Sequence, residues 1–357
     1  EMIESFENIY GNPSSTHTLG QKAKAVVENA RHIVAKNLKV EAKEIVFTSG
    51  GAEGNNLVIK GFLKQNKDKG KHIITTKIEH STVLKTFESL EKQGYDVTYI
   101  DVTKDGIIDV EKLKKAVRKD TALVSVMFVN NETGVIQPIK EIGEFLKEKE
   151  IFFHTDAVQA IGKFEIYPKE LRIDALTVSS HKFYGPKGTG FVFIDKKYNI
   201  EKEIFGGSQE RNRRAGTENV NGILGTGVAL EEVYEKMEVI FEHEKKIQEY
   251  LEEKLKNEIG RIQKVEINGE NSRRVKNITN VFIENTDIQM LLVALDMRGI
   301  CVSGGSACMS GSLENSYVLK AMGLNDEKLK SSFRISIGKD TTIEEIDYFI
   351  ENLKEII

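Results

Sequence analysis

Residues 173–188 read IDALTVSSHKFYGPKG, and this stretch decides the fold class. An apolar run of β type over 173–178 leads into a turn that contains two glycines and a proline. Lys182 lies between the strand and the turn, beside a histidine and two serines. Lysine is normally a mobile surface charge, and burial would lower its pKa by disfavouring the charged form. We therefore expect Lys182 to be a neutral amine that attacks a carbonyl, whereas a solvated loop lysine is the ordinary alternative.

Strands and helices alternate on both sides of this stretch. Apolar side chains at helical spacing predict a helix over 19–38. Further β-rich runs predict strands at 44–48, 72–76, 97–100, 122–129, 151–155 and 190–194, and helical patterns lie at 81–93, 110–119 and 138–149. Alternation of this kind predicts a mostly parallel sheet covered by helices.

The remainder of the chain predicts a second, smaller domain. A Glu/Lys-rich helical stretch spans about 219–259. The elements that follow are strands at 278–283 and 333–337 and helices at 287–297 and 342–356. This order is typical of a small α+β domain. We expect a large domain over 11–245 and a small domain over 246–357, which also takes residues 1–10.

Composition excludes several classes of protein. The chain has 357 residues, of which 39% are hydrophobic and 30% charged, and a formal net charge of −4. Mixed charges without a basic stripe argue against direct nucleic-acid binding, and no apolar run reaches membrane-spanning length. Cys301 and Cys308 are the two cysteines. A disulfide framework or zinc site is improbable with so few, and we expect a protein of the reducing cytoplasm.

A glycine-rich turn follows the strand expected at 44–48. Residues 48–56, TSGGAEGNN, open a helix there, and glycines let backbone N–H groups approach a phosphate at the helix N-terminus. The Gly-Lys-Ser/Thr ending of a nucleotide P-loop is absent from this stretch. Taken alone, the stretch could equally be an ordinary βα turn.

Two further side chains lie at strand–helix junctions, where open α/β sheets bind ligands. Asp156 ends the run that begins at 151, and a carboxylate there can keep the nitrogen of a pyridine ring protonated, with Gln159 in reach of the same ring. His80 follows the strand at 72–76 and could stack on such a ring and move protons near neutral pH. Helix capping by the aspartate and plain surface polarity of the histidine are the alternatives.

The small domain contributes an arginine and a loop cysteine. Arg334 lies within an expected strand, where its planar fork suits a substrate carboxylate, and a structural salt bridge is the alternative. Cys308 lies in SGGSACMSGS at 303–312, where a thiol on an exposed, flexible loop can act as a nucleophile, although it could also be a tolerated loop cysteine. Cys301, between two apolar residues of an apparent strand, has the setting of a buried and inert cysteine. A phosphate anchor, a pyridinium partner, a stacking group and a nucleophilic lysine together favour a pyridoxal phosphate enzyme.

These runs together resemble the cysteine desulfurases of the NifS/IscS type, which are pyridoxal phosphate enzymes of the class V aminotransferase fold. The resemblance covers nearly the whole chain. The matching runs are GNPSS at 11–15, EIVFTSG at 44–50, KIEHST at 77–82, NNETG at 130–134, DAVQ at 156–159, SSHKFYGPKG at 179–188, ERNRRAGTENV at 210–220, SGGSAC at 303–308 and SSFRISIG at 331–338. The resemblance implies an α/β, aspartate aminotransferase-like fold, with a mostly parallel sheet in the large domain and a small α+β domain.

The resemblance also implies cofactor roles, position by position. Lys182 corresponds to the lysine that binds pyridoxal 5′-phosphate covalently, Asp156 to the partner of the pyridine nitrogen, and His80 to the group stacked on the ring. The other implied cofactor contacts are Gln159 and Asn131 at the ring substituents, Ser179, His181, Gly51 and Ala52 at the phosphate, and Thr217, which the neighbouring subunit lends to that phosphate.

For the reaction, the resemblance implies that Asn12 and Arg334 bind the carboxylate of L-cysteine and that Cys308 takes up the sulfur. The SGGSAC setting resembles the long-loop group of the family. The implied products are L-alanine and a Cys308 persulfide, which passes to a sulfur-acceptor or scaffold protein of iron–sulfur assembly or tRNA thiolation. A cytoplasmic homodimer without a metal site or direct nucleic-acid or membrane partners is implied.

Two rival functions and two departures from the family remain at this point. A selenocysteine lyase or a class V aminotransferase on the same fold is the first rival, although transamination would not need Cys308. A catalytically silent scaffold subunit is the second, and retention of Lys182, Asp156 and His80 disfavours it. Ala52 stands where the family usually has a hydroxyl, so we expect weaker cofactor retention. The Asp-Asn-Ala run that opens the family is absent before Glu1, and we expect the natural protein to have further residues there.

Overall fold

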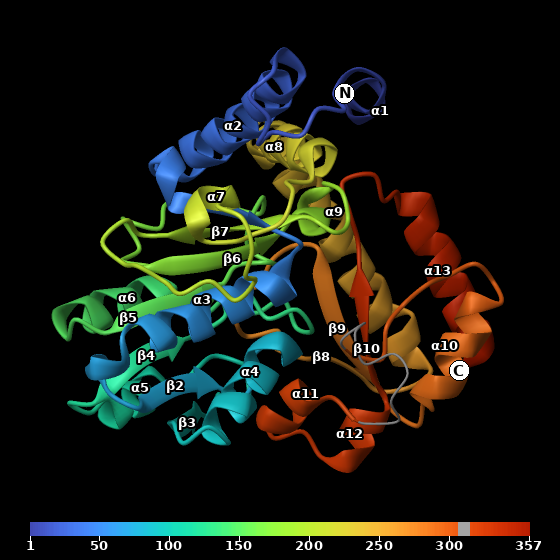
Figure 1. The fold of residues 1–357 in the computed structure, drawn as a ribbon. Helices are drawn as coiled ribbons and strands as arrows, with labels where there is room; N and C mark the ends of the chain where they lie inside the picture. The colour runs from blue at the N-terminus through green and yellow to red at the C-terminus, as the bar shows by residue number, and fades with distance from the viewer. Residues whose placement is uncertain (306–314) are drawn as a thin grey trace. The chain divides into compact units, whose positions relative to one another are not determined.

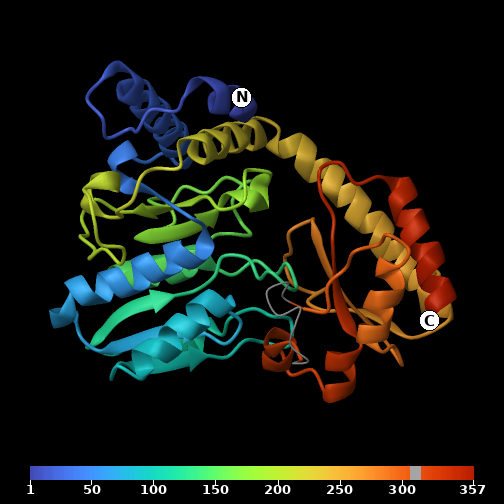
Figure 2. The same cartoon turned by 45° about the vertical axis from the view of Figure 1, so that its right-hand side comes forward.

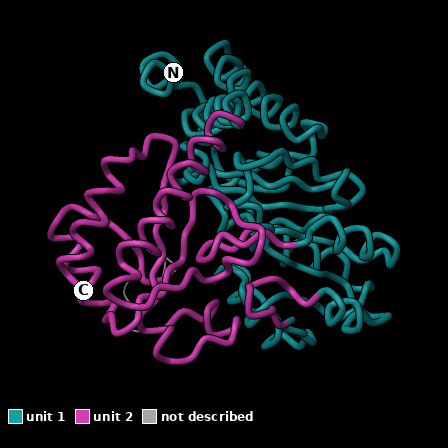
Figure 3. The backbone as a smooth tube through the Cα atoms, turned by 180° about the vertical axis from the view of Figure 1, so that it is seen from behind, with its two compact units in different colours: residues 1–100, 110–128, 138–237 teal, residues 101–109, 129–137, 238–357 magenta. Residues whose placement is uncertain are grey.

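The computed structural model describes residues 1–305 and 315–357 and divides into two compact units (Figure 3). Unit 1 consists of residues 1–100, 110–128 and 138–237, and unit 2 consists of residues 101–109, 129–137 and 238–357. The predicted domain boundaries differ from these units in three respects. Residues 1–10 belong to unit 1, the segments 101–109 and 129–137 within the predicted large domain belong to unit 2, and unit 2 resumes at residue 238 rather than at 246.

The position of residues 1–10 has a simple physical reason. Helix α1 (Met2–Asn8) packs on α8 (Val220–Glu235), which is itself part of unit 1. Helix α2 (Thr18–Leu38) packs on the same helix along its buried face. The N-terminal segment is therefore held by helices of unit 1, and the prediction that placed it with the small domain differs from the structure.

Unit 1 is built on one seven-stranded sheet with the strand order β1-β7-β6-β5-β4-β2-β3 (Figure 1). The strands are β1 (Ile45–Thr48), β2 (His72–Thr76), β3 (Asp96–Ile100), β4 (Thr121–Ser125), β5 (Phe152–Asp156), β6 (Ala175–Ser179) and β7 (Gly190–Ile194). All neighbours pair in parallel except β7, which is antiparallel to both β1 and β6. Because the central strands are buried on both faces, they read as continuous apolar runs in the sequence. The predicted mostly parallel sheet is confirmed.

Helix α3 (Gly51–Gln65) packs on β6 and β7 and directs its N-terminus to the edge of the sheet where β1, β5 and β6 end. Gly54 makes this close packing possible, since an added Cβ there would lie 2.6 Å from Cγ2 of Thr177 and 2.8 Å from Cγ1 of Val192. Gly50 precedes the helix with a φ of +142°, a conformation that favours glycine. The glycine-rich turn thus fixes the start of α3 beside the strand ends.

The other regular elements of unit 1 surround this sheet. They are η1 (Ala42–Glu44), η2 (Lys67–Lys69), α4 (Ser81–Glu91), α5 (Val110–Ala116), α6 (Ile139–Glu148), η3 (Ser180–Phe183) and α7 (Gln209–Asn212). The helices expected at 81–93, 110–119 and 138–149 correspond to α4, α5 and α6, with Pro138 at the N-cap position of α6.

Unit 2 contains a three-stranded antiparallel sheet with the order β10-β9-β8. Its elements are α9 (Met237–Asn257), which begins with the last residue of unit 1, η4 (Ile259–Arg261), β8 (Val265–Ile267), β9 (Ile278–Ile283), α10 (Ile288–Asp296), α11 (Tyr317–Ala321), α12 (Asp326–Lys330), β10 (Ser332–Ser336) and α13 (Ile343–Ile356). In Figures 1 and 2, α9 and α13 lie alongside each other. Buried side chains of both helices, of α10 and of the three strands form one apolar core. This is the α+β arrangement that the sequence predicts.

Three details correct the sequence-based expectations. Strand β4 ends at Ser125 rather than at 129, although the backbone N–H of Phe128 still donates to the Asp156 carbonyl at 2.9 Å. The helical stretch 219–259 is two helices, because the backbone leaves the helical conformation at Lys236. Cys301 is exposed and lies outside any strand, so its predicted burial is wrong. Among the residues that the structure describes, no helix is long and apolar enough to cross a membrane.

Candidate functional site

A chain of hydrogen bonds in unit 1 connects two of the predicted cofactor residues. Asp156 ends β5 and is 5% exposed, and its Oδ2 accepts a hydrogen bond from Asn55 Nδ2 at 2.8 Å. The same Asn55 nitrogen donates to Thr82 Oγ1 at 2.9 Å. Thr82 Oγ1 lies 2.9 Å from Nδ1 of His80, which caps helix α4. Asp156 and His80 are thus brought into one polar network by two residues that the sequence analysis did not identify.

Asn55 could have been noticed in the sequence. It is fully buried on α3, and an asparagine inside a helix is unfavourable because its side chain competes for backbone hydrogen bonds. Its Oδ1 has no hydrogen-bond partner within residues 1–305 and 315–357. Asp156 Oδ1 is held separately, since it accepts from the backbone N–H of Val158 at 3.0 Å. Both oxygens of the carboxylate are therefore fixed in direction.

The predicted phosphate contacts gather at the N-terminus of α3. An added Cβ on Gly50 would lie 3.3 Å from Oγ of Ser179, and one on Gly51 would lie 4.0 Å from Cβ of the same serine. Ser179 Oγ also lies 2.9 Å from Nδ1 of His181. The pKa of His181 is lowered by desolvation and then by the positive charges of Lys182 and Lys187. A helix N-terminus, a serine hydroxyl and an imidazole together form a site suited to an anion.

Lys182 lies in the short helix η3, which follows β6 directly. Its side chain is half-buried. The turn around Lys182 is attached to α8, because Ser180 Oγ lies 2.8 Å from Oγ1 of Thr226 on that helix. Tyr184 ends the turn in the left-handed conformation, with a φ of +67°. The predicted nucleophile therefore lies on a fixed turn next to Ser179.

Two buried titratable groups are related to Asp156: His154 is near it in the sequence, and Glu79 interacts with its charge. His154 lies two residues earlier on β5, and burial lowers its pKa to about 3. Its ring nitrogens lie 2.9 Å from Ser125 Oγ and 3.0 Å from Thr177 Oγ1. The pKa of Glu79 is raised to about 8, chiefly by burial and in smaller part by the charge of Asp156. Near neutral pH His154 and Glu79 are therefore mostly uncharged.

Unit 2 brings Asn131 and Arg334 together. The guanidinium Nη1 of Arg334 donates to the backbone carbonyl of Asn131 at 2.8 Å. Asn131 is 7% exposed, and its side-chain Oδ1 has no hydrogen-bond partner in the described part of the chain. The backbone of Arg334 also forms an isolated bridge with Ser303, at the start of the stretch that leads to Cys308. The predicted carboxylate-binding arginine is thus joined to the beginning of the predicted sulfur-accepting loop.

Four other predicted site residues are more exposed to solvent. Thr217, Ala52 and Asn12 are exposed, and Gln159 is half-buried. Asn12 belongs to unit 1 and Arg334 to unit 2, so their predicted pairing at one substrate carboxylate stays a prediction. Cys308 lies outside the described residues.

Comparison with known proteins identifies the family. The family model described as aminotransferase class-V matches residues 1–349. The cysteine desulfurase IscS of Clostridium botulinum strain Hall is 48% identical over 359 residues, which cover 100% of this chain and 90% of that protein. This chain belongs to the cysteine desulfurases of the class V aminotransferase family.

Further relatives agree. Cysteine desulfurase IscS of Methanosarcina thermophila is 47% identical, with 100% of this chain and 87% of that protein covered. A solved NifS-like protein superposes with a TM-score of 0.93 at 38% identity, covering 100% of this chain and 94% of that one. A solved structure of SspA in complex with cysteine gives a TM-score of 0.84 at 34% identity, covering 96% and 94%. The predicted resemblance and the predicted fold are confirmed.

Cysteine desulfurases are pyridoxal phosphate enzymes, and the residues of this chain fit that cofactor. The glycine turn and Ser179 form a cradle at a helix N-terminus where an anion is favoured. Asp156 supplies a buried carboxylate that is fixed at both oxygens. Asn131 belongs to unit 2, so its predicted contact with the cofactor ring stays a prediction.

Proposed function

We propose that this cysteine desulfurase removes sulfur from L-cysteine and transfers it to Cys308, giving L-alanine and a Cys308 persulfide. The products contain every atom of L-cysteine and of the Cys308 thiol. The observation that carries the proposal is the network in which Asn55 and Thr82 join Asp156 to His80, next to the glycine cradle of α3. The relative solved with cysteine supports the choice of substrate.

Pyridoxal phosphate supplies an electron sink when it is bound. Lys182 would hold it covalently, and Gly51, Ala52, Ser179 and His181 would hold its phosphate. On the ring, Asp156 would pair with the pyridine nitrogen, His80 would cover one face, and Gln159 and Asn131 would contact the substituents.

The chain's own residues then bind the substrate and move protons. Arg334 and Asn12 bind and orient the substrate carboxylate. The Nζ of Lys182 moves the proton at the substrate Cα. The thiolate of Cys308 attacks the substrate sulfur, so an S–S bond forms while the bond from that sulfur to Cβ breaks. The electron pair of the broken bond goes to Cβ, which takes up a proton and becomes the methyl group of alanine.

We further propose that the protein acts as a homodimer in the cytoplasm and passes its sulfur to an acceptor or scaffold protein of iron–sulfur assembly or tRNA thiolation. Exposed apolar side chains support the dimer. Ile3 and Phe6 lie one turn apart on α1 with 79% and 66% of their surface exposed, and Tyr10 and Phe205 are 75% and 70% exposed. Thr217, which would complete the neighbour's phosphate site, is exposed as such a role requires.

The sharpest test of the proposed reaction is Cys308→Ser. This variant should keep pyridoxal phosphate and still bind L-cysteine, because Lys182 and Asp156 are unchanged. It should form alanine only at background rate, since a serine hydroxyl is not ionised near neutral pH and is a poor nucleophile toward sulfur. The measurements are the cofactor absorbance with and without L-cysteine, and alanine and sulfide formed with a reductant present.

Cys301→Ser is the matched control. Cys301 is the other cysteine of the chain, and it is exposed in the same unit. It should react at the parent rate. Parent rates of alanine and sulfide formation by Cys308→Ser would show that the loop cysteine does not accept sulfur. A cofactor that fails to respond to L-cysteine in either variant would count against the substrate.

A further inference from the structure

Residues 208–217, here called the strap, belong to unit 1, contact its edge strand β1 through Glu210 and end at Thr217. Three consecutive residues of the strap adopt the left-handed conformation: Glu210, Arg211 and Asn212 have φ angles of +46°, +56° and +62°. Such a run is unfavourable for residues other than glycine, because Cβ approaches the following carbonyl. It persists only where the surroundings determine it, and such strain is typical of functional segments.

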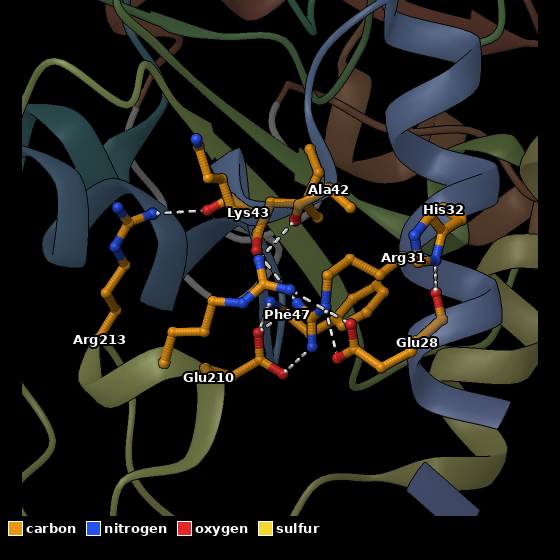
Figure 4. A network of polar contacts seen from close by, with 10 residues as sticks. Glu28, Arg31, His32, Ala42, Lys43, Phe47, Glu210 and Arg213 are labelled. Carbon is orange, nitrogen blue, oxygen red and sulfur yellow. Dashed lines mark hydrogen bonds and ion pairs between the residues drawn. The ribbon is translucent and has the colours of Figure 1, made fainter. Parts of the chain in front are cut away.

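An ion pair holds the left-handed turn against the edge of the sheet. Arg31 of α2 and Glu210 form two parallel hydrogen bonds, of 2.7 Å from Nη1 to Oε2 and 2.9 Å from Nη2 to Oε1 (Figure 4). Strand β1 is the last strand of the sheet on this side. The backbone N–H of Phe47 donates to Glu210 Oε2 at 2.8 Å, and the carbonyl of Ile45 accepts from Arg31 Nη1 at 3.0 Å. The pair thus takes the place of a further strand by satisfying the outward-facing groups of β1.

The pair is buried, and Arg31 has a second carboxylate partner in Glu28, whose Oε1 accepts from Arg31 Nε at 3.0 Å and whose side chain is 34% exposed. The side chains of Arg31 and Glu210 are 3% and 2% exposed. Burial alone would lower the pKa of Arg31, but the hydrogen bonds and charges of Glu210 and, to a smaller extent, of Glu28 together outweigh it, and the pKa is raised. The guanidinium also lies over the ring of Phe47, 4.8 Å from its centre. Removing Arg31 would leave the buried Glu210 without its counter-charge, and removing Glu210 would leave Arg31 with Glu28 as its carboxylate partner; both losses are unfavourable.

The strap is anchored again beyond the left-handed turn. Arg213 donates to the backbone carbonyl of Lys43 at 3.1 Å (Figure 4). Arg214 forms two hydrogen bonds with Glu53, and Glu53 in turn accepts from the backbone N–H of Ser49. Glu53 lies in the first turn of α3, directly after the predicted phosphate cradle. The strap is therefore fixed within the turn by Glu210 and beyond it by Arg213 and Arg214, and Thr217 follows Arg214 by three residues.

We propose that the Arg31–Glu210 pair is a positioning device that sets the strap so that Thr217 reaches the phosphate site of the partner subunit. The inference rests on the proposed homodimer and on the proposed role of Thr217. Neither Arg31 nor Glu210 touches cofactor or substrate in this proposal. They act by holding three strained residues in one conformation, and through these residues they determine where Thr217 lies.

The proposal makes a prediction that a purely local role would not. Breaking the ion pair in one subunit should weaken pyridoxal phosphate binding at the partner subunit's site and leave binding at its own site unchanged. The test uses heterodimers purified through two different tags. In the first pairing, an otherwise unchanged subunit is joined to one that carries Lys182→Ala and Glu210→Gln. In the second pairing, a subunit with Glu210→Gln is joined to one that carries Lys182→Ala alone. Each heterodimer then contains one site that can bind pyridoxal phosphate covalently.

The readout is the dissociation constant of pyridoxal phosphate at that site, followed by the absorbance of the lysine-bound cofactor. In the first pairing it should rise roughly tenfold or more, the cost of losing one hydrogen bond to a charged phosphate. In the second pairing the dissociation constant should equal the value measured for a reference heterodimer, in which an unchanged subunit is joined to a subunit with Lys182→Ala alone. Glu252→Gln, which breaks the two-bond pair with Arg274 in unit 2, is the matched control and should behave alike in both pairings.

Thr217→Ala in the same two pairings separates this inference from the proposed function. If Thr217→Ala and Glu210→Gln each weaken pyridoxal phosphate binding in the first pairing only, the result supports both the positioning role of the ion pair and the role of Thr217 in the partner's site. If Thr217→Ala acts in the first pairing while Glu210→Gln acts in the second or in both, the positioning role is overturned and the dimer role of Thr217 stands. If Thr217→Ala acts only within its own subunit, the proposed function is wrong on this point. Should Glu210→Gln subunits not fold, Arg31→Lys gives the same comparison with the charge retained.

Discussion

Replacing Asn55 by alanine should destabilise the apoprotein and lower its affinity for pyridoxal phosphate. Asn55 is fully buried, and its single side-chain nitrogen bonds to both Asp156 and Thr82. Alanine keeps the helix, since it is the best helix former, and removes only these contacts. The perturbation therefore acts on the network that joins Asp156 to His80.

The size of the effect follows from the bonds. A hydrogen bond to a carboxylate contributes about 1.5–3 kcal/mol, and a neutral one about 0.5–1.5 kcal/mol. Removal of Asn55 Oδ1, which is buried without a partner among the described residues, offsets about 1 kcal/mol of this loss. We expect a net decrease of about 2 kcal/mol in the free energy of unfolding. Asp156 keeps one bond, from the N–H of Val158, so its carboxylate can rotate and should hold a pyridinium less tightly.

Asn56→Ala is the matched control, because it changes the next residue of the same helix. Asn56 is on the more accessible side of α3 and bonds only to the Ala52 carbonyl one turn earlier, so its loss should stay within about 0.5 kcal/mol. Urea unfolding of both apoproteins measures the stability, and equilibrium titration measures the affinity for pyridoxal phosphate. Equal stability and equal affinity of the two variants would refute the role that we assign to the Asn55 network.

Two other changes test single contacts. Ala52→Thr adds a hydroxyl to the first turn of α3, where one hydrogen bond to a phosphate is worth at most roughly 1.5–3 kcal/mol. It should slow cofactor loss during dialysis, and equal or faster loss would show that backbone groups already saturate the phosphate. His154, whose pKa falls from about 6.5 unfolded to about 3 folded, stays neutral in the protein while the unfolded chain takes up a proton below pH 6.5. The stability that it contributes is present above that pH and falls by about 1.4 kcal/mol per unit as pH drops toward 3, so urea unfolding at pH 7 and pH 5 should show a steeper decline than in His154→Gln.

The sheet could be predicted from the sequence because its signal is local. Strand β2 has the predicted bounds, 72–76, and β7 has the predicted bounds, 190–194. Both are short runs rich in β-branched and aromatic residues, and both are buried along their whole length, which favours such runs directly. Strand β8 (Val265–Ile267) was missed because it has three residues and alternates with a glutamate. Cys301 was misjudged for a related reason: its apolar neighbours pack on the core of unit 2 while the cysteine between them faces outward.

The contacts that orient the site could not be predicted, because their partners are far apart in the chain. Asn55 and Asp156 are 101 residues apart, and Arg31 and Glu210 are 179 residues apart. No periodicity or motif connects such pairs, and each residue alone has an ordinary explanation on a helix or in a loop. The residues that carry the chemistry are marked by neighbouring motifs, whereas the residues that hold them in place are identified only by geometry.

The two units are drawn from several parts of the sequence, whereas the sequence alone predicts a single main boundary at 245/246. Unit 2 includes residues 129–137, which come from the middle of the sequence of the predicted large domain. This segment is not peripheral, because the carbonyl of Asn131 accepts from Arg334 and the carbonyl of Glu132 accepts from Asn280 Nδ2 at 3.2 Å. A fragment cut at 245/246 would leave the buried Asn280 on β9 and the half-buried Arg334 on β10 without these acceptors. The predicted carboxylate-binding arginine is therefore held by a segment that also contains Asn131, a predicted cofactor contact.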